Sequence, residues 1–204
     1  MAYTDINSFW FQGCETNPEM LPQAAKRWFS GGEQLDAMIR ERFAHLFEPL
    51  AAKMEQSSEL ISAFGAAESL AMVVLFDQFS RNCFRKSVKA FSFDALALQI
   101  LDSMEALGLQ ESLHPIQRVF LYMPLQHAES LSRQTQGVAA FEQLSNLAEA
   151  PYRKIVEGSF NYAIEHKAIV ERFGRFPHRN YVLGRASTEA EVEYLNSGGK
   201  RYGQ

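Results

Sequence analysis

Apolar residues recur at helical spacing along nearly the whole chain, and this periodicity is the feature that most limits its fold. No stretch keeps for long the strict apolar and polar alternation that a half-buried strand needs. One helical stripe comprises Leu35, Ile39, Phe43, Leu46 and Leu50. It predicts one long helix with a kink at Pro49. The pattern as a whole predicts an all-α fold.

Start and stop signals divide this pattern into successive helices. The predicted segments are residues 4–12, 18–28, 35–50, 68–82, 87–107, 132–148 and 151–173, together with a helix that His114 and Pro115 open and Pro124 bends. Thr188 and Glu191 match a capping box and predict a last short helix. Short connections favour antiparallel neighbours, so we expect stacked antiparallel helix pairs. Because no low-complexity linker interrupts residues 1–204, we expect a single domain.

The sequence offers no signal for membrane insertion or for a bound cofactor. Its longest apolar run, Leu70 to Phe76, is seven residues long, whereas a spanning helix needs about 20. The N-terminus lacks the pattern of a secretory signal, so we expect a cytoplasmic protein. Cys14 and Cys83 lack metal or redox spacing and are predicted to be reduced and buried. We expect no cofactor and no metal.

Positive charge is concentrated in two segments of an otherwise acidic chain. The net charge is −4, from 20 basic and 24 acidic residues. Residues 78–93 and residues 172–185 each contain four basic residues and no acidic one. Without these segments the chain would carry 12 basic residues against 24 acidic ones. Such local positive charge indicates a small anion-binding surface, and the surrounding acidity argues against a nucleic-acid partner.

The first basic segment belongs to a predicted polar helix face. Asp77, Gln78, Arg81, Asn82 and Arg85 fall within an arc of about 140° if the helix persists. In one interpretation Asp77 positions an arginine fork that clamps a carboxylate or phosphate. In the other interpretation Asp77 and Arg81 form a surface pair one helical turn apart.

The second basic segment breaks a helix at Gly174 and Pro177 and then presents His178, Arg179 and Asn180 from irregular backbone. Loops on a rigid scaffold often carry functional residues, which supports a ligand-binding surface here. Alternatively, its arginines cap helix ends and pair with the acidic remainder.

Two further polar residues follow the predicted bend at Pro124. His127 and Glu129 have the chemistry for proton transfer, but their spacing is not that of a zinc hydrolase. His166 shares a helical face with Tyr162 and Val170, which indicates a hydrogen-bonded core histidine. No nucleophile elbow and no phosphate-binding loop is present.

Several of these motifs together resemble one bacterial family. The resemblance rests on Phe9-Trp10-Phe11, Trp28-Phe29, Asp36, Ile39-Arg40, Phe43, the run from Asp77 to Asn82, the run from Phe120 to Leu125 with His127, the run from Arg172 to Asn180, and Leu183-Gly184-Arg185. The chain is similar to the bacterial domain of unknown function 924, a member of the tetratricopeptide-like helical superfamily. This resemblance implies a right-handed tetratricopeptide-like helical array, and it implies no reaction.

The sequence thus leads to two hypotheses of function. In the first, a cleft lined by arginine, histidine and asparagine binds a small anionic ligand or an acidic peptide end. The predicted binding residues are Asp77, Arg81, Asn82, Arg85, His127, Glu129, His178, Arg179 and Asn180. In the second, His127 or His178 acts as the general base of a small-molecule hydrolase or isomerase. A homo-oligomer remains open, because apolar helix faces close a dimer as readily as a core.

Overall fold

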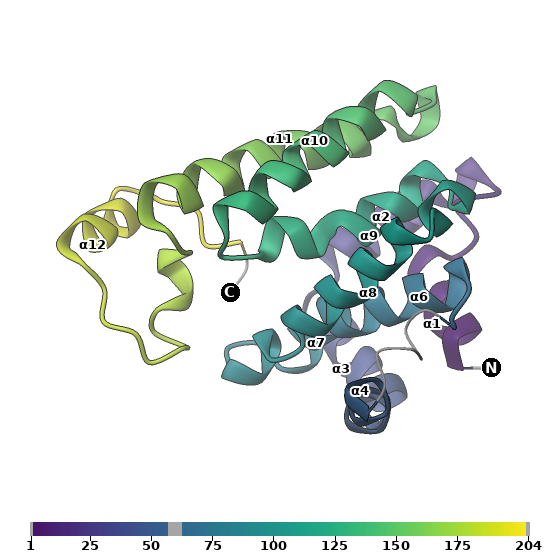
Figure 1. Ribbon diagram of the computed structural model, residues 1–204, viewed down its shortest axis with the longest axis horizontal. Helices are drawn as coiled ribbons and strands as arrows, with labels where there is room; N and C mark the ends of the chain where they lie inside the picture. Colours follow the sequence, from purple (N-terminus) through teal and green to yellow (C-terminus); the bar gives the residue numbers. More distant parts are fainter. Residues whose placement is uncertain (1, 57–62, 203–204) are drawn as a thin grey trace.

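The computed structural model describes residues 2–56 and 63–202, and these residues form helices and no strand (Figure 1). The α-helices are α1 (Ala2–Phe11), α2 (Leu21–Ser30), α3 (Gly32–Phe43), α4 (Phe47–Gln56), α6 (Ala66–Val73), α7 (Ser80–Cys83), α8 (Asp94–Ala106), α9 (Pro115–His127), α10 (Leu131–Leu147), α11 (Ala150–Phe173) and α12 (Glu189–Asn196). A π-helix, η3 (Val74–Phe79), joins α6 to α7. The prediction of an all-α fold is confirmed.

Local capping signals set several helix ends where they were predicted. The side chain of Thr188 accepts a hydrogen bond from the backbone N–H of Glu191, and the carboxylate of Glu191 accepts one from the backbone N–H of Thr188. His114 forms the same kind of capping box at the start of α9. Gly174 ends α11 with a φ of 71°, in the left-handed region that favours glycine.

Four predicted helices differ from the structure. The segment 18–28 begins with the 3-10 turn η1 (Pro18–Met20), and the π-helix η3 interrupts the segment 68–82. Residues 35–50 do not form one helix, because the break lies at the 3-10 turn η2 (Ala44–Leu46) rather than at Pro49. Pro49 lies in the first turn of α4, where a missing N–H costs no hydrogen bond. The segment 87–107 begins with another 3-10 turn, η4 (Val88–Phe91), and α8 starts only at Asp94.

Aromatic side chains build much of the hydrophobic core. The ring of Trp10 meets Phe79 at a centroid distance of 5.4 Å and Phe120 at 5.5 Å, both in edge-on contacts. These contacts join α1, η3 and α9 around one centre. The core extends from Ile6 to Ala163, and both cysteines are free and buried in it, as predicted.

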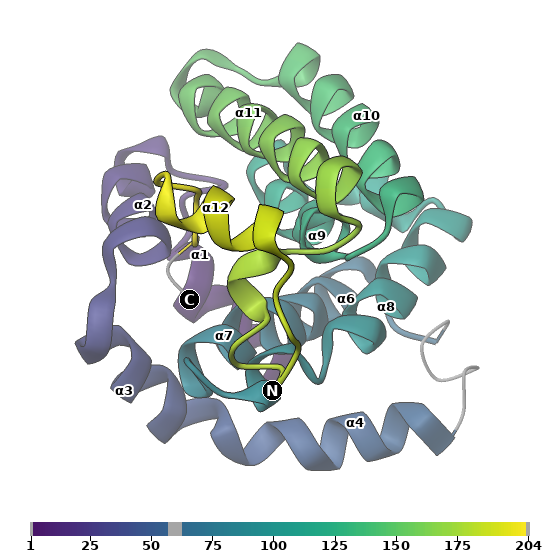
Figure 2. The same ribbon diagram turned by 90° about the vertical axis from the view of Figure 1, so that its left-hand side faces the viewer.

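The helices α9, α10 and α11 pack as consecutive neighbours, with α10 and α11 side by side and antiparallel (Figures 1 and 2). Antiparallel pairing is therefore present here, whereas the right-handed tetratricopeptide-like array and the single domain stay predictions. Within the described residues, no helix is both long enough and apolar enough to cross a bilayer.

After Gly174, two ion pairs fasten the C-terminal segment, residues 174–202, which faces the viewer in Figure 2. Arg185 donates to both carboxylate oxygens of Glu129, at 2.5 and 2.9 Å. Arg175 likewise donates to both carboxylate oxygens of the buried Glu191, at 2.7 and 2.8 Å. This segment is therefore carried back over the end of α9, where Glu129 lies.

Two helical glycines differ in the space around them and give a matched test of this packing. A Cβ at Gly137 would lie 3.0 Å from the Cβ of Leu125, whereas a Cβ at Gly158 would meet nothing within 4 Å. Alanine favours a helix over glycine by about 1 kcal/mol. We expect Gly158→Ala to raise the free energy of unfolding by about that amount. We expect Gly137→Ala to lower it, because α9 and α10 would be forced apart.

Urea denaturation of both variants would measure the two changes. A stabilised Gly137→Ala variant would contradict the close approach of α9 and α10.

Candidate functional site

The π-helix η3 presents a fully buried carboxylate, Asp77, to the helices around it. π-Helical turns are rare and occur frequently at functional sites. The wider turn frees backbone carbonyls, and nearby side chains bond them: Ser80 donates to the carbonyl of Phe76 at 2.6 Å, and Arg81 donates to that of Asp77 at 2.8 Å. The backbone carbonyls of Phe76 and Asp77 therefore have side-chain hydrogen-bond donors in spite of the irregular helix.

Asp77 orients the imidazole of His127 at the end of α9. The Nδ1 atom of His127 lies 2.7 Å from Oδ1 of Asp77. Burial would raise the pKa of Asp77, but His127, Arg81 and a hydrogen bond from Gln78 together lower it well below its usual range. An ionised carboxylate only accepts hydrogen bonds, so Nδ1 of His127 carries the proton. Its Nε2 atom is then the acceptor nitrogen of the neutral ring.

Burial and the positive charge of Arg81 lower the pKa of His127 below the usual value near 6.5, in spite of Asp77. The backbone around His127 is also fixed, because Gln134 donates to the carbonyls of Gln126 and Ala128. The ring is thus neutral at pH 7 and held in one tautomer.

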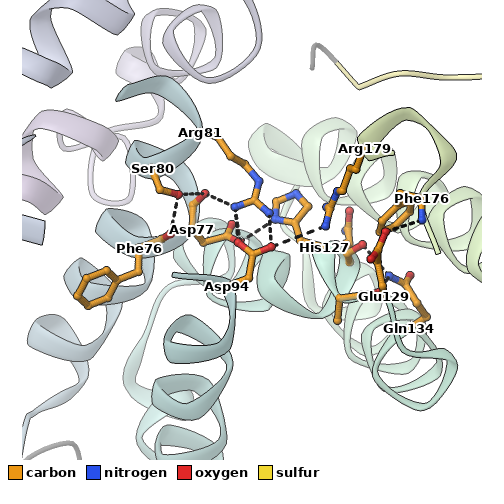
Figure 3. A network of polar contacts seen from close by, with 12 residues as sticks. Phe76, Asp77, Ser80, Arg81, Asp94, His127, Glu129, Gln134, Phe176 and Arg179 are labelled. Atoms are coloured by element: carbon orange, nitrogen blue, oxygen red, sulfur yellow. Dashed lines mark hydrogen bonds and ion pairs between the residues drawn. The ribbon is translucent and has the colours of Figure 1, made fainter. Parts of the chain in front are cut away.

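Arg81 connects the π-helix with α8. Its guanidinium donates to both carboxylate oxygens of Asp94, at 2.9 and 3.0 Å, and lies 3.3 Å from Oδ1 of Asp77 (Figure 3). The two aspartates raise its pKa above the usual value even though burial would lower it. Both partners are buried or half-buried, so this is an internal ion pair and not a surface pair.

Arg179 reaches the same region from the C-terminal segment (Figure 3). It is only 6% exposed, and its guanidinium lies between the rings of Phe91 and Phe176, 4.7 and 4.6 Å from their centroids. Its ion-pair contact, with Asp94, is 3.7 Å long, and its Nε atom has no hydrogen-bond partner among the described residues. Burial and the nearby Arg81 lower its pKa to about 10. Arg179 is therefore a buried cation with incomplete compensation.

These side chains surround a small cavity of about 50 Å³. Its lining consists of Arg81, Phe91, His127, His166, His178, Arg179 and Tyr202. The lining contains no acidic side chain, because Asp77 and Asp94 lie behind the groups that they orient. Among the described residues, the cavity thus faces cationic, neutral polar and aromatic side chains and no anionic one.

The other two histidines of the lining are also neutral. His166 donates from Nδ1 to the carbonyl of Tyr162 at 2.7 Å, which leaves Nε2 as its acceptor. Burial, with nearby His127 for His166 and nearby Arg179 for His178, lowers the pKa of each to about 3. Tyr202 stacks on His166 at a centroid distance of 4.0 Å. Among the described residues no group of three or more His, Cys, Asp or Glu side chains is placed to hold a metal ion.

The structure brings together Asp77, Arg81, His127, His178 and Arg179 out of the predicted set. It places two other members elsewhere. Asn82 donates to Oδ1 of Asp36 at 2.7 Å, and Arg85 donates to both carboxylate oxygens of the same residue. The polar helix face divides because the π-turn changes the angular spacing and α7 ends at Cys83.

Glu129 and Asn180 support the loop that carries Arg179 and do not line the cavity. Glu129 pairs with Arg185 and accepts the backbone N–H of Phe176 at 2.7 Å. Asn180 accepts from Arg185 and donates to Glu191. Both side chains fix the chain immediately around Arg179.

Sequence reasoning missed Phe91, Asp94 and Tyr202, and it gave His166 only a core role. His166 is buried and hydrogen-bonded as predicted, yet it also lines the cavity. Asp94 is the first acidic residue after the acid-free segment 78–93, and this position was the signal available for it. Tyr202 is distant along the chain from His166 and His178, whose rings it contacts, so no local sequence pattern predicts these contacts.

Comparisons with known proteins identify the family of this chain and a solved structure with a similar fold. A model of the family described as bacterial protein of unknown function (DUF924) matches residues 6–199. A solved structure of a protein of unknown function from Agrobacterium tumefaciens is similar, with 33% sequence identity and a TM-score of 0.75 over 96% of this chain and 97% of that chain. Among curated proteins none matches significantly. The chain belongs to the DUF924 family of bacterial proteins.

Proposed function

We propose that the protein binds a small anion in the cavity between Arg81 and Arg179. One observation carries this proposal: three buried polar atoms of the lining have no hydrogen-bond partner among the described residues. They are Nε of Arg179, Nδ1 of His178 and the hydroxyl of Tyr202. Buried polar groups are normally bonded, so three unpaired ones in residues that line the same cavity favour a polar ligand there.

The size of the cavity and the charge of its lining limit the class of anion that it can bind. The cavity volume of about 50 Å³ compares with roughly 30 Å³ for one water molecule in the liquid. A planar carboxylate group suits this space and matches the paired N–H donors of a guanidinium. Arg81 already donates to both carboxylate oxygens of Asp94, whereas Nε of Arg179 has no hydrogen-bond partner among the described residues, so Arg179 supplies the free donor. The rings of Phe91 and Phe176 hold that donor in place before the ligand arrives.

A substitution at Arg179 tests whether this residue contributes to anion binding or to the stability of the fold. We expect Arg179→Gln to weaken acetate binding at least about tenfold, because a charge-assisted hydrogen bond contributes about 1.5–3 kcal/mol. The melting temperature should change little, because removal of an incompletely paired buried charge offsets the lost ring contacts. Isothermal titration calorimetry and thermal unfolding measure the two effects. Arg153→Gln, at an exposed arginine of α11, is the control. Equal losses of binding and stability would indicate a structural role for Arg179.

Anion binding should also take up a proton. His127 and His166 offer acceptor nitrogens to the cavity, and an anion beside them raises their pKa. Because the pKa of His127 is below its usual value before the anion binds and the anion raises it, binding strengthens as the pH falls toward the pKa of the anion-free His127 and levels off below it. Asp77, Arg81 and Arg179 are the charged groups that set this shift at His127.

Calorimetry in two buffers of different ionisation enthalpy would measure the proton uptake. We expect His127→Gln to reduce it, whereas His45→Gln, at an exposed histidine, should leave it unchanged. Affinity that is independent of pH would contradict this linkage.

A second candidate function rests on the Asp77–His127 pair. A carboxylate that fixes one tautomer of a neutral histidine is the arrangement of a general base in hydrolases and isomerases. His127 has this partner, whereas His178 has no acidic hydrogen-bond partner among the described residues. If the protein is an enzyme, His127 is the base and Arg179 binds the anionic part of the substrate.

Turnover assays on compounds that bind the cavity test this second function. We expect kcat/KM to fall as the pH drops below the pKa of His127, which lies under 6.5, since protonation removes the base. His127→Gln should lower kcat at least about a hundredfold and change KM little. His45→Gln is again the control. Recovery of every bound compound unchanged would leave the protein a binder.

A further inference from the structure

We infer that the anion is the carboxylate of an acyl chain, whose hydrocarbon part lies in a second, apolar groove between α2 and α11. This inference rests on the proposed anion site and names the class of its ligand. The groove has a volume of about 570 Å³. Phe29 and Ala25 of α2 line one wall, and Ile155, Gly158 and Tyr162 of α11 line the other.

Exposed aromatic surface marks this groove. Phe29 is 57% exposed and Tyr162 is 50% exposed, although both are large apolar side chains. An isolated exposed hydrophobic residue needs no explanation, but two that face one concave surface indicate a binding site for an apolar group. Lys154 is its basic side chain, and Ser159 donates its hydroxyl proton to the backbone carbonyl of Ile155. The walls therefore offer few unpaired polar groups.

One face of α11 connects the groove with the cavity. Ile155, Gly158 and Tyr162 follow at intervals of three and four residues, and His166 is the next position on the same face. Gly158 and His166 are thus about 12 Å apart along the helix axis. The ring of Tyr162 lies 6.5 Å from that of His166 and 6.4 Å from that of Tyr202. The groove therefore ends at the rings that line the anion cavity.

Tyr202 lies at the junction between the groove and the cavity, where its ring contacts Tyr162 and His166. Its hydroxyl has no hydrogen-bond partner among the described residues, and its φ of 48° is unusual for a residue other than glycine. A ligand that occupies both the groove and the cavity must displace this ring, which contacts both Tyr162 and His166. Its hydroxyl is also placed to donate to the incoming carboxylate.

An acyl carboxylate fits these walls better than the other anionic ligands with an apolar part. An extended peptide would leave its backbone N–H and C=O groups unpaired against helices, which satisfy their own hydrogen bonds. A phospholipid headgroup exceeds the cavity of about 50 Å³. An acyl group attached to a protein has no free carboxylate for Arg179. A free medium-chain acid satisfies both the groove and the cavity.

A chain-length series tests this inference. We expect octanoate to bind far more tightly than acetate, with a gain of about fourfold for each methylene that the groove accepts. Octanol, which lacks the charge, and octylamine, which carries the opposite charge, should bind much more weakly than octanoate. Calorimetry gives the affinities, and the NMR signal of the Arg179 Nε–H group reports whether the carboxylate reaches the cavity.

Gly158→Leu fills the groove without touching the anion site, since a Cβ at Gly158 meets open space. This variant should weaken the binding of longer acids of the series, such as dodecanoate, whose chains extend as far as Gly158, at least about tenfold and leave acetate binding unchanged. Arg153→Gln, at an exposed arginine of α11 outside the groove lining, is the control and should bind each acid as the natural protein does. If Gly158→Leu does not fold, Ala25→Leu blocks the opposite wall of the groove.

The outcomes separate this inference from the proposed function. If acetate binding depends on Arg179 but octanoate binds no more tightly, the acyl ligand is excluded and the anion site remains. If octanol binds as tightly as octanoate, or if Gly158→Leu keeps the full gain, the groove and the cavity do not share a ligand. If neither acid depends on Arg179, the anion site itself is excluded.

Discussion

The buried carboxylate of Asp77 is the constraint on which the arrangement of the site depends. A charge removed from water must be offset by nearby donors and opposite charge, or it destabilises the fold by several kcal/mol. Arg81 and His127 supply this compensation from α7 and α9. Asp94 then compensates Arg81 from α8. The burial of one charge thus fixes the relative positions of η3, α7, α8 and α9, and with them the lining residues Arg81 and His127.

Arg179 is the part of the network that stability alone does not explain. Its distance of 3.7 Å from Asp94, its unpaired Nε atom and its lowered pKa all indicate a cation that folding disfavours. Two ion pairs nevertheless fasten the loop that carries it, through Glu129 and Glu191. Residues that cost stability while their surroundings are built to hold them typically serve binding or catalysis. These contacts therefore hold Arg179 beside the cavity at a cost in stability.

The parts of this structure that short-range rules determine could be predicted from the sequence. Capping residues such as Thr188 and the periodicity of α11 depend on neighbours within a few positions. The acid-free segments identified Arg81 and Arg179, although their meeting depends on tertiary packing. Asn82 was grouped with Arg81 because the π-turn of η3 cannot be recognised from a regular helical repeat. Tyr202 reaches the cavity because the chain turns back after Gly174. The glycine predicts that turn, but it does not predict where the following segment packs.

The neutral histidines decide what kind of anion the cavity suits. Protonated rings beside Arg81 and Arg179 would repel one another, and burial prevents this by lowering their pKa values. Because these rings are neutral, they add no positive charge to that of the two arginines, and His127 and His166 each have an acceptor nitrogen. The lone pairs of these acceptor nitrogens would repel a fully deprotonated, highly charged anion. A singly charged carboxylate needs only the Arg179 donor and one proton, and Asp77 stabilises that proton once it reaches His127.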